Sequence, residues 1–175
     1  KTPPALPEDT AIWNIQQSGQ ALLANAGYRQ YEVSAYARDG FQCRHNRNYW
    51  EFGDYLGVGA GAHSKITHAN GVILRRWKVR HPTAYLKKAG TELALDGSET
   101  LTDAQKPLEF LMNALRLRRG FAESAFSERT GLPLSALQPQ MDACLADGLL
   151  QREHGCISCT ELGWRFLDSV LSRFC

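Results

Sequence analysis

The spacing of apolar and polar side chains predicts a helix, two strands and a long loop in the first part of the chain. The apolar side chains of residues 8–26 lie roughly on one helical side: Ile12, Ile15, Leu22 and Leu23. Residues 28–37 alternate as a strand does, and residues 55–62 form an apolar run that favours a second, buried strand. Residues 38–54 lack periodicity and are expected to form a loop.

A hairpin and several short helices are expected in the rest of the chain. Asn70-Gly71 is a turn signal before a strand at Val72–Trp77, and a short helix is expected near residues 82–89. Further helices are expected at 103–118, 122–130, 134–147 and from residue 161 onward, with a hairpin at 149–152 and 156–160. Helix, helix-turn-helix, hairpin and helix is the order of a winged-helix module.

The fold class that follows is α/β, or α+β within this fragment. The first elements resemble the closing segment of an α/β barrel, because a parallel sheet needs several crossover units and one is visible. We therefore expect residues 1–97 to be the last elements of a TIM-like partial barrel and residues 98–175 to be a winged-helix-like, mostly helical domain. The chain starts at Lys1 and not at a methionine, so we expect a piece of a longer protein. A self-contained α+β unit is the alternative.

Charge is distributed unevenly along the chain. Residues 1–90 carry 12 Lys and Arg against 6 Asp and Glu, whereas residues 91–175 carry 8 against 12. The basic stretch Lys65–Lys88 contains no acidic residue and could meet an anionic ligand. The helix expected at 134–147 contains no Lys or Arg, although phosphate contacts dominate binding to DNA. We therefore expect no nucleic-acid partner.

Cysteine usage and hydropathy indicate the cell compartment. Five cysteines at scattered positions do not form the framework of a secreted disulfide protein, and Cys156-x-x-Cys159 lacks the further ligands of a zinc site. No apolar run approaches the roughly 18 residues typical of a transmembrane helix. We expect a cytoplasmic protein that meets a membrane only through its partners.

Candidate binding residues are concentrated between residues 43 and 64. The imidazole of His45 and the amide of Asn46 precede the aromatic pair Tyr49 and Trp50. A haem or another porphyrin needs an axial donor together with apolar surface, so His45 is the candidate ligand of a haem iron.

The glycines of the same stretch do not form a known phosphate cradle. Gly57, Gly59 and Gly61 alternate, which is not the spacing of a dinucleotide-binding fingerprint, and no Gly-Lys-Ser/Thr follows them. Small residues here would let another molecule approach the backbone closely.

The string YEVSAYARDGFQCRHNRNYWEFGDYLGVGAGAHS resembles the C-terminal part of the oxygen-independent coproporphyrinogen-III-oxidase-like radical-SAM family. Within that family it is most similar to the haem-chaperone subgroup, HemW. His45, Asn46, Tyr49 and Trp50 match the subgroup's H-N-x-x-Y-W motif, and the resemblance implies that they bind haem. The later segment RRWKVRHPTAYL matches a flanking family segment in order.

The resemblance also implies a parent protein with a 4Fe-4S cluster, held by C-x3-C-x2-C, and S-adenosyl-L-methionine (SAM) bound to it. No three cysteines of this chain have that spacing. We therefore expect no catalytic residue here, and the fragment alone is expected to be inactive. Gly59, Gly61 and His63 are the SAM contacts that the family implies for this chain.

Three functions are consistent with these residues. The main hypothesis is a haem chaperone that delivers haem to acceptor haemoproteins. The alternative is an oxygen-independent coproporphyrinogen III oxidase, which decarboxylates propionates through a SAM-derived radical in haem biosynthesis. The third is a DNA-binding or scaffold module. Whether the parent is an enzyme stays open. Exposed apolar faces of 28–37 and 55–62 would also lead to self-association.

Overall fold

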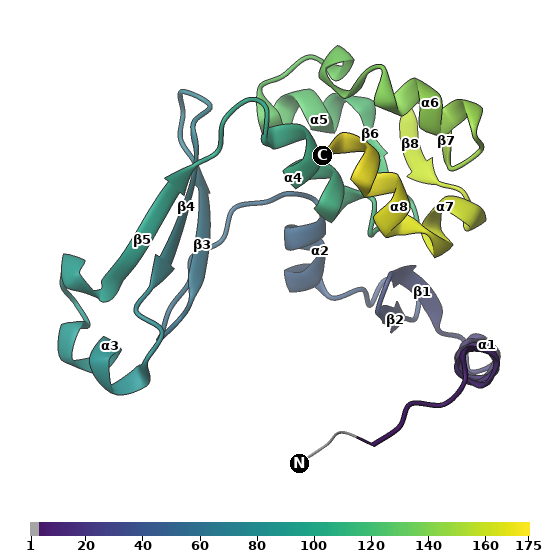
Figure 1. Ribbon diagram of the computed structural model, residues 1–175, viewed down its shortest axis with the longest axis horizontal. Helices are drawn as coiled ribbons and strands as arrows, with labels where there is room; N and C mark the ends of the chain where they lie inside the picture. Colours follow the sequence, from purple (N-terminus) through teal and green to yellow (C-terminus); the bar gives the residue numbers. More distant parts are fainter. Residues whose placement is uncertain (1–3) are drawn as a thin grey trace. The chain divides into compact units, whose positions relative to one another are not determined.

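The computed structural model describes residues 4–175, and the chain divides after Cys43 into two compact units. Each unit mixes helices with antiparallel strands (Figure 1). The expected mixed α and β composition is confirmed. Within the described residues no helix combines the length and the apolar character needed to cross a membrane.

The first unit contains one helix and one hairpin. Helix α1 (Asp9–Asn25) matches the expected helix but buries no residue. The single strand expected at 28–37 is wrong, because the chain turns back between β1 (Arg29–Glu32) and β2 (Ala35–Ala37). The buried Glu32 carboxylate accepts a hydrogen bond of 2.9 Å from the Ser34 backbone N–H and so stabilises the turn.

The second unit begins with a helix where a loop was expected. Helix α2 (Arg44–Trp50) occupies the centre of the 38–54 segment. A three-stranded antiparallel sheet follows, with the order β3 (His63–Thr67), β4 (Ile73–Lys78) and β5 (Leu95–Thr100). The Asn70-Gly71 turn joins β3 and β4 as predicted, and helix α3 (Pro82–Lys88) lies before β5.

The strand expected at 55–62 is also wrong. This segment makes one antiparallel bridge, between Tyr55 and Lys65, and then leaves the sheet. The Gly57 backbone N–H donates to the Ser64 hydroxyl at 2.8 Å, an interaction with a side chain in place of a strand partner. Leu56 and Val58, which gave the segment its apolar pattern, are 77% and 87% exposed.

The remaining elements largely follow the predicted order. They are α4 (Lys106–Ala114), β6 (Phe121–Ala122), α5 (Glu123–Thr130), α6 (Gln140–Ala146), β7 (Leu150–Glu153), β8 (Cys156–Cys159), α7 (Glu161–Arg165) and α8 (Leu167–Leu171). A short strand, β6, precedes α5 where none was expected, and the helix expected from residue 161 is divided into α7 and α8. The strands form a sheet of order β6-β8-β7. The helix expected at 134–147 is divided, since Pro139 separates a 3-10 turn at Leu134–Leu137 from α6.

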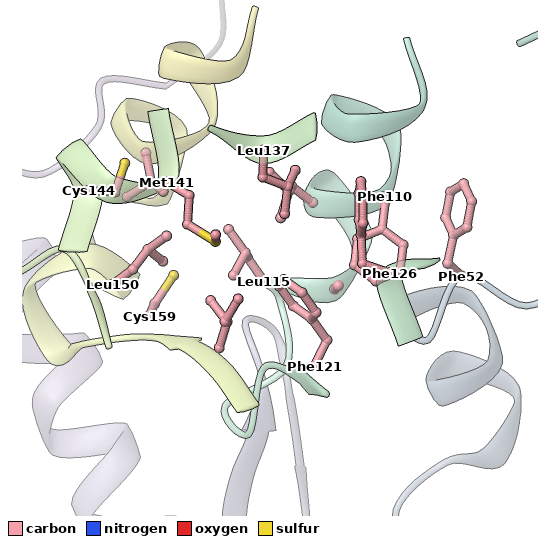
Figure 2. Packing of buried hydrophobic residues seen from close by; sticks show 14 of the residues in the cluster. Phe52, Phe110, Leu115, Phe121, Phe126, Leu137, Met141, Cys144, Leu150 and Cys159 are labelled. Carbon is pink, nitrogen blue, oxygen red and sulfur yellow. The ribbon is translucent and has the colours of Figure 1, made fainter. Parts of the chain in front are cut away.

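One apolar core connects α2 and the sheet to these helices (Figure 2). The Phe110 ring meets Phe52, Phe121 and Phe126 edge to face, at centroid distances of 5.5, 5.0 and 5.3 Å. Phe52 lies just after α2, and Ile73 of β4 is fully buried in the same cluster. The position of α2 is therefore fixed by the core of the second unit.

Candidate functional site

Helix α2 presents the candidate haem ligand on an exposed side. His45 and Tyr49 are one helical turn apart, and their rings meet edge to face with centroids 4.9 Å apart. The His45 side chain is exposed, and within the second unit its ring contacts only that of Tyr49. Its imidazole nitrogens can therefore reach a ligand without breaking a hydrogen bond described in this unit.

Asn46 and Trp50 lie on the neighbouring side of the same helix. Both are half-buried, and α2 packs against α4. The Arg116 guanidinium carbon lies 4.3 Å from the centroid of the Trp50 ring, within the range of a cation–π contact. The four motif residues thus come together on one short helix but point from it in two directions.

Ion pairs stabilise the far end of α2. Arg47 donates to the Glu51 carboxylate at 2.6 Å, and the Arg119 guanidinium, far along the chain, pairs with the same carboxylate. These contacts explain how a sequence without helical periodicity forms a helix here. The Arg47–Glu51 pair is local, but Arg119 is a tertiary partner, and short helices depend on tertiary packing for their stability.

Lys65 anchors the segment that follows α2. Its side chain is 3% exposed, and its ammonium donates to the Phe52 carbonyl and to the Asp54 carboxylate, both at 3.0 Å. It also lies 4.1 Å from the centroid of the Phe52 ring. Burial lowers the pKa of Lys65, although Asp54 acts in the opposite direction. The sequence analysis placed this lysine in a basic stretch that could meet an anionic ligand, but its ammonium is paired with Asp54 within the chain.

Asp54 completes this anchor. Burial tends to raise the pKa of its carboxyl, but hydrogen bonds from the Thr67 backbone and hydroxyl and from Lys65 outweigh it and hold the pKa below its usual value. The turn itself needs Gly53, because a Cβ there would lie 2.2 Å from the Asn48 side-chain oxygen. The connection from α2 to β3 is therefore sterically and electrostatically fixed.

Tyr55 links α2 to the sheet. Its ring centroid lies 4.4 Å from that of Tyr49, and its backbone forms the bridge to Lys65. Burial raises the pKa of the Tyr55 phenol, with the nearby Arg75 acting against the shift. The phenol is thus a neutral ring between the helix and the Arg75 guanidinium. The sequence analysis did not identify Tyr55.

One glycine of the string, Gly57, lies directly against the backbone of His63. A Cβ on Gly57 would lie 2.2 Å from the His63 carbonyl oxygen, so only glycine fits at this position without a shift of the backbone. Gly59 and Gly61 instead have positive φ angles, of 109° and 68°, and turn the chain. The exposed His63 ring stacks on Trp77 at a centroid distance of 6.3 Å.

Two hollows border this stack. One has a volume of about 390 Å³ and is lined by Tyr55, His63, Ser64, Arg75, Trp77 and Glu99. The other, of about 600 Å³, is lined by Gly61, His63, Trp77 and Arg80, with Ala60, Lys78 and Asp96. Both volumes fall in the range of small-molecule sites, roughly 300–1,000 Å³.

Metal-binding clusters are not a feature of the described residues. Between residues 4 and 175 no three His, Cys, Asp or Glu side chains are grouped so that they could hold an ion. Cys144 and Cys159 are buried, and burial raises the pKa of the Cys159 thiol to about 12. Cys43, Cys156 and Cys175 are exposed.

Comparisons with known proteins agree with the sequence resemblance. Residues 101–166 match the family described as "HemN C-terminal domain". The chain is 45% identical over 172 residues to "Heme chaperone HemW" of Escherichia coli K12, and 42% identical to that of Haemophilus influenzae. Each match covers 98% of this chain and 44% of the relative.

A solved structure shares the fold. It is described as "Coproporphyrinogen III oxidase (HemN) from Escherichia coli is a Radical SAM enzyme", with a TM-score of 0.68 and 18% identity, over 97% of this chain and 42% of that one. The chain thus spans less than half the length of the relatives it matches. From these matches, the chain belongs to the family of HemN- and HemW-like radical-SAM proteins and corresponds to their C-terminal part.

Proposed function

We propose that this chain is the C-terminal part of a HemW-like protein that binds haem and delivers it to acceptor haemoproteins. The observation that carries the proposal is the exposed His45 imidazole, seated against Tyr49 on a helix fixed by the core. Relatives that share 42–45% of the sequence are named haem chaperones. An accessible imidazole next to aromatic surface is suited to a flat metalloporphyrin cargo.

Each residue of the motif has a defined part in this proposal. His45 supplies the axial nitrogen to the haem iron, and the Tyr49 ring offers apolar surface to the macrocycle. Asn46 and Trp50 support the site from the neighbouring side of α2, where Trp50 packs under Arg116.

A haem titration of the full-length protein tests the proposal. Wild type should show a saturable change in the Soret absorption, and His45→Ala should lose the signature of histidine ligation. His68→Ala is the matched control, because His68 is also exposed but lies in the β3–β4 turn. Equal haem affinity and an equal spectrum in wild type and His45→Ala would remove His45 from the site.

Coproporphyrinogen oxidation is the alternative function. The shared fold with the Escherichia coli oxidase supports it, and substrate carboxylates would be an anionic ligand for the basic stretch Lys65–Lys88, but cations of that stretch are partly paired within the chain. Lys65 is buried against Asp54, and Arg75 forms a bidentate pair with Glu109 at 3.0 and 2.7 Å. Turnover of coproporphyrinogen by the reconstituted full-length protein would favour the oxidase over the chaperone.

The missing part of the parent would hold the 4Fe-4S cluster and SAM. In this proposal Gly59, Gly61 and His63 contribute to SAM binding, and the hollow of about 600 Å³ beside Gly61 and His63 has room for part of such a molecule. The cluster would supply one electron for reductive cleavage of SAM. Its cysteine ligands are expected upstream of this chain.

We also propose the domain division at residues 97/98, the winged-helix assignment of the second domain and a cytoplasmic location. Nucleic acid is not the expected partner of that domain. Within residues 134–147, Asp142 and Asp147 are the charged side chains, and Asp147 already pairs with Arg173 at 2.6 Å. Self-association is expected for the isolated chain, because Leu56, Val58 and the α1 side chains are exposed.

A further inference from the structure

The hollow of about 390 Å³ lies on a regular arrangement of strand positions. Strand register places Lys65 opposite Arg75 and Arg75 opposite Glu99, with Tyr55 bridged to Lys65 at the sheet edge. The adjacent row, two residues along, pairs His63 with Trp77 and Trp77 with Gly97. Side chains of both rows share one face of the sheet, since residues two apart point the same way.

The Trp77 ring lies flat on this face because of Gly97. A Cβ on Gly97 would come within 2.3 Å of the Trp77 ring, so the indole extends over β5 where a side chain would otherwise stand. Trp77 thereby presents a broad aromatic surface on one side of the hollow. Tyr55 provides a second ring.

Polar groups at the base of the hollow are held in place. Glu109 binds both terminal nitrogens of Arg75, which fixes the guanidinium and leaves its Nε without a hydrogen-bond partner among the described residues. Ser64 lies between His63 and Lys65 on β3, so its side chain points to the opposite face of the sheet, where its hydroxyl accepts from the Gly57 N–H. Flat aromatic side chains beside an oriented guanidinium suit a conjugated ring system.

The hollow is continuous with the proposed haem helix. Tyr55 lines it and also contacts Tyr49, which contacts His45. Ring contacts therefore run from His45 through Tyr49 to Tyr55, and Tyr55 lines the same hollow as Trp77. The charge of Arg75 is balanced by Glu109, so the hollow is suited to an apolar macrocycle edge more than to a free anion.

We propose that the haem site extends from α2 across Tyr55 into this hollow, where Trp77 contacts the edge of the porphyrin. This inference rests on the proposed haem-binding function and adds Tyr55, Trp77 and the sheet face to the site. Trp77 determines the orientation of the macrocycle, while His45 holds the iron. Two variants can test this without altering His45.

The first variant fills the hollow and the second removes its wall. Glu99 lies on the exposed edge strand β5, so Glu99→Trp adds a ring to the hollow without changing the core, and Glu99→Gln is its control. Trp77→Leu removes the aromatic surface. In a haem titration of the full-length protein without SAM, each should weaken haem affinity roughly five- to ten-fold, the worth of one aromatic contact.

Circular dichroism in the Soret band adds a readout that stability alone would not move. A porphyrin beside Trp77 should lose much of its induced signal in Trp77→Leu, while Glu99→Gln keeps it. If His45→Ala weakens binding but Glu99→Trp and Trp77→Leu bind haem with wild-type affinity and signal, the extension is refuted and the haem function stands. If wild type itself does not bind haem, the proposed function fails first.

Discussion

Replacing Lys65 by Met should destabilise the second unit far more than a surface lysine substitution does. Met keeps the apolar stem but removes an ammonium that is hydrogen-bonded to the Phe52 carbonyl and Asp54, both at 3.0 Å. Phe52 is 2% exposed, so water cannot easily replace that donor. An unsatisfied buried acceptor costs about 1–3 kcal/mol, and the lost charge-assisted bond to the half-exposed Asp54 adds about 1 kcal/mol. We expect a loss of roughly 3 kcal/mol.

Urea denaturation measures this loss as a change in midpoint at unchanged slope. Lys87→Met is the control, because Lys87 lies exposed at the end of α3 and should change stability by less than about 0.5 kcal/mol. Lys65→Met should also speed amide hydrogen exchange in residues 44–57, since Lys65 ties this segment to β3. A destabilisation equal to that of Lys87→Met would show that the buried cation does not hold α2 in position.

Three further outcomes are expected. Gly120→Ala should destabilise the chain by more than about 2 kcal/mol in the same urea assay, because a Cβ there would lie 1.9 Å from the Ile157 carbonyl oxygen. Gly131→Ala is the control, since Gly131 has a similar positive φ but open space around it, and it should cost about 1 kcal/mol. The folded pKa of Asp54 is lowered, so its stabilising effect is present above the unfolded pKa and is lost as pH falls through the folded value. The gap in unfolding free energy between wild type and Asp54→Asn should therefore be constant near about pH 6 and shrink towards about pH 2; a gap that widens in acid would contradict this. Maleimide should label the exposed thiols of the native chain at neutral pH, those of Cys43, Cys156 and Cys175. Mass spectrometry should find the buried Cys144 and Cys159 modified only after unfolding. Rapid labelling of Cys159 in the native chain would contradict its burial and its raised pKa.

Sequence periodicity predicted the elements that bury one regular face. Helices α4 and α5 and the β7–β8 hairpin form where they were expected, and each buries an apolar residue: Phe110, Phe126 and Ile157. The segment 55–62 misled the same reasoning, because Leu56 and Val58 alternate with small residues as in a buried strand. Both side chains are exposed in this chain, so the alternation of apolar and small residues did not indicate burial here.

Helix α2 was missed because its stability comes from distant partners. Its residues lack apolar periodicity, and the Arg119 partner of Glu51 lies 68 positions along the chain. His45 was nevertheless identified from its residue type and from the H-N-x-x-Y-W motif, and the structure places its ring against that of Tyr49, one helical turn away. The motif thus identified a candidate binding residue in a segment where the hydropathy pattern predicted no element.

The residues that surround the proposed cargo could not be found from the chain pattern. Tyr55, Arg75 and Trp77 lie in segments read as ordinary strands, and strand register alone brings them to one face. Register is set here by the Lys65–Asp54 anchor and by the Asn70-Gly71 turn together. If the anchor sets the position of Tyr55, then Lys65→Met should alter the haem spectrum as well as the stability, although Lys65 lines neither hollow beside Trp77. The buried lysine would then connect the core of the second unit to the orientation of the porphyrin.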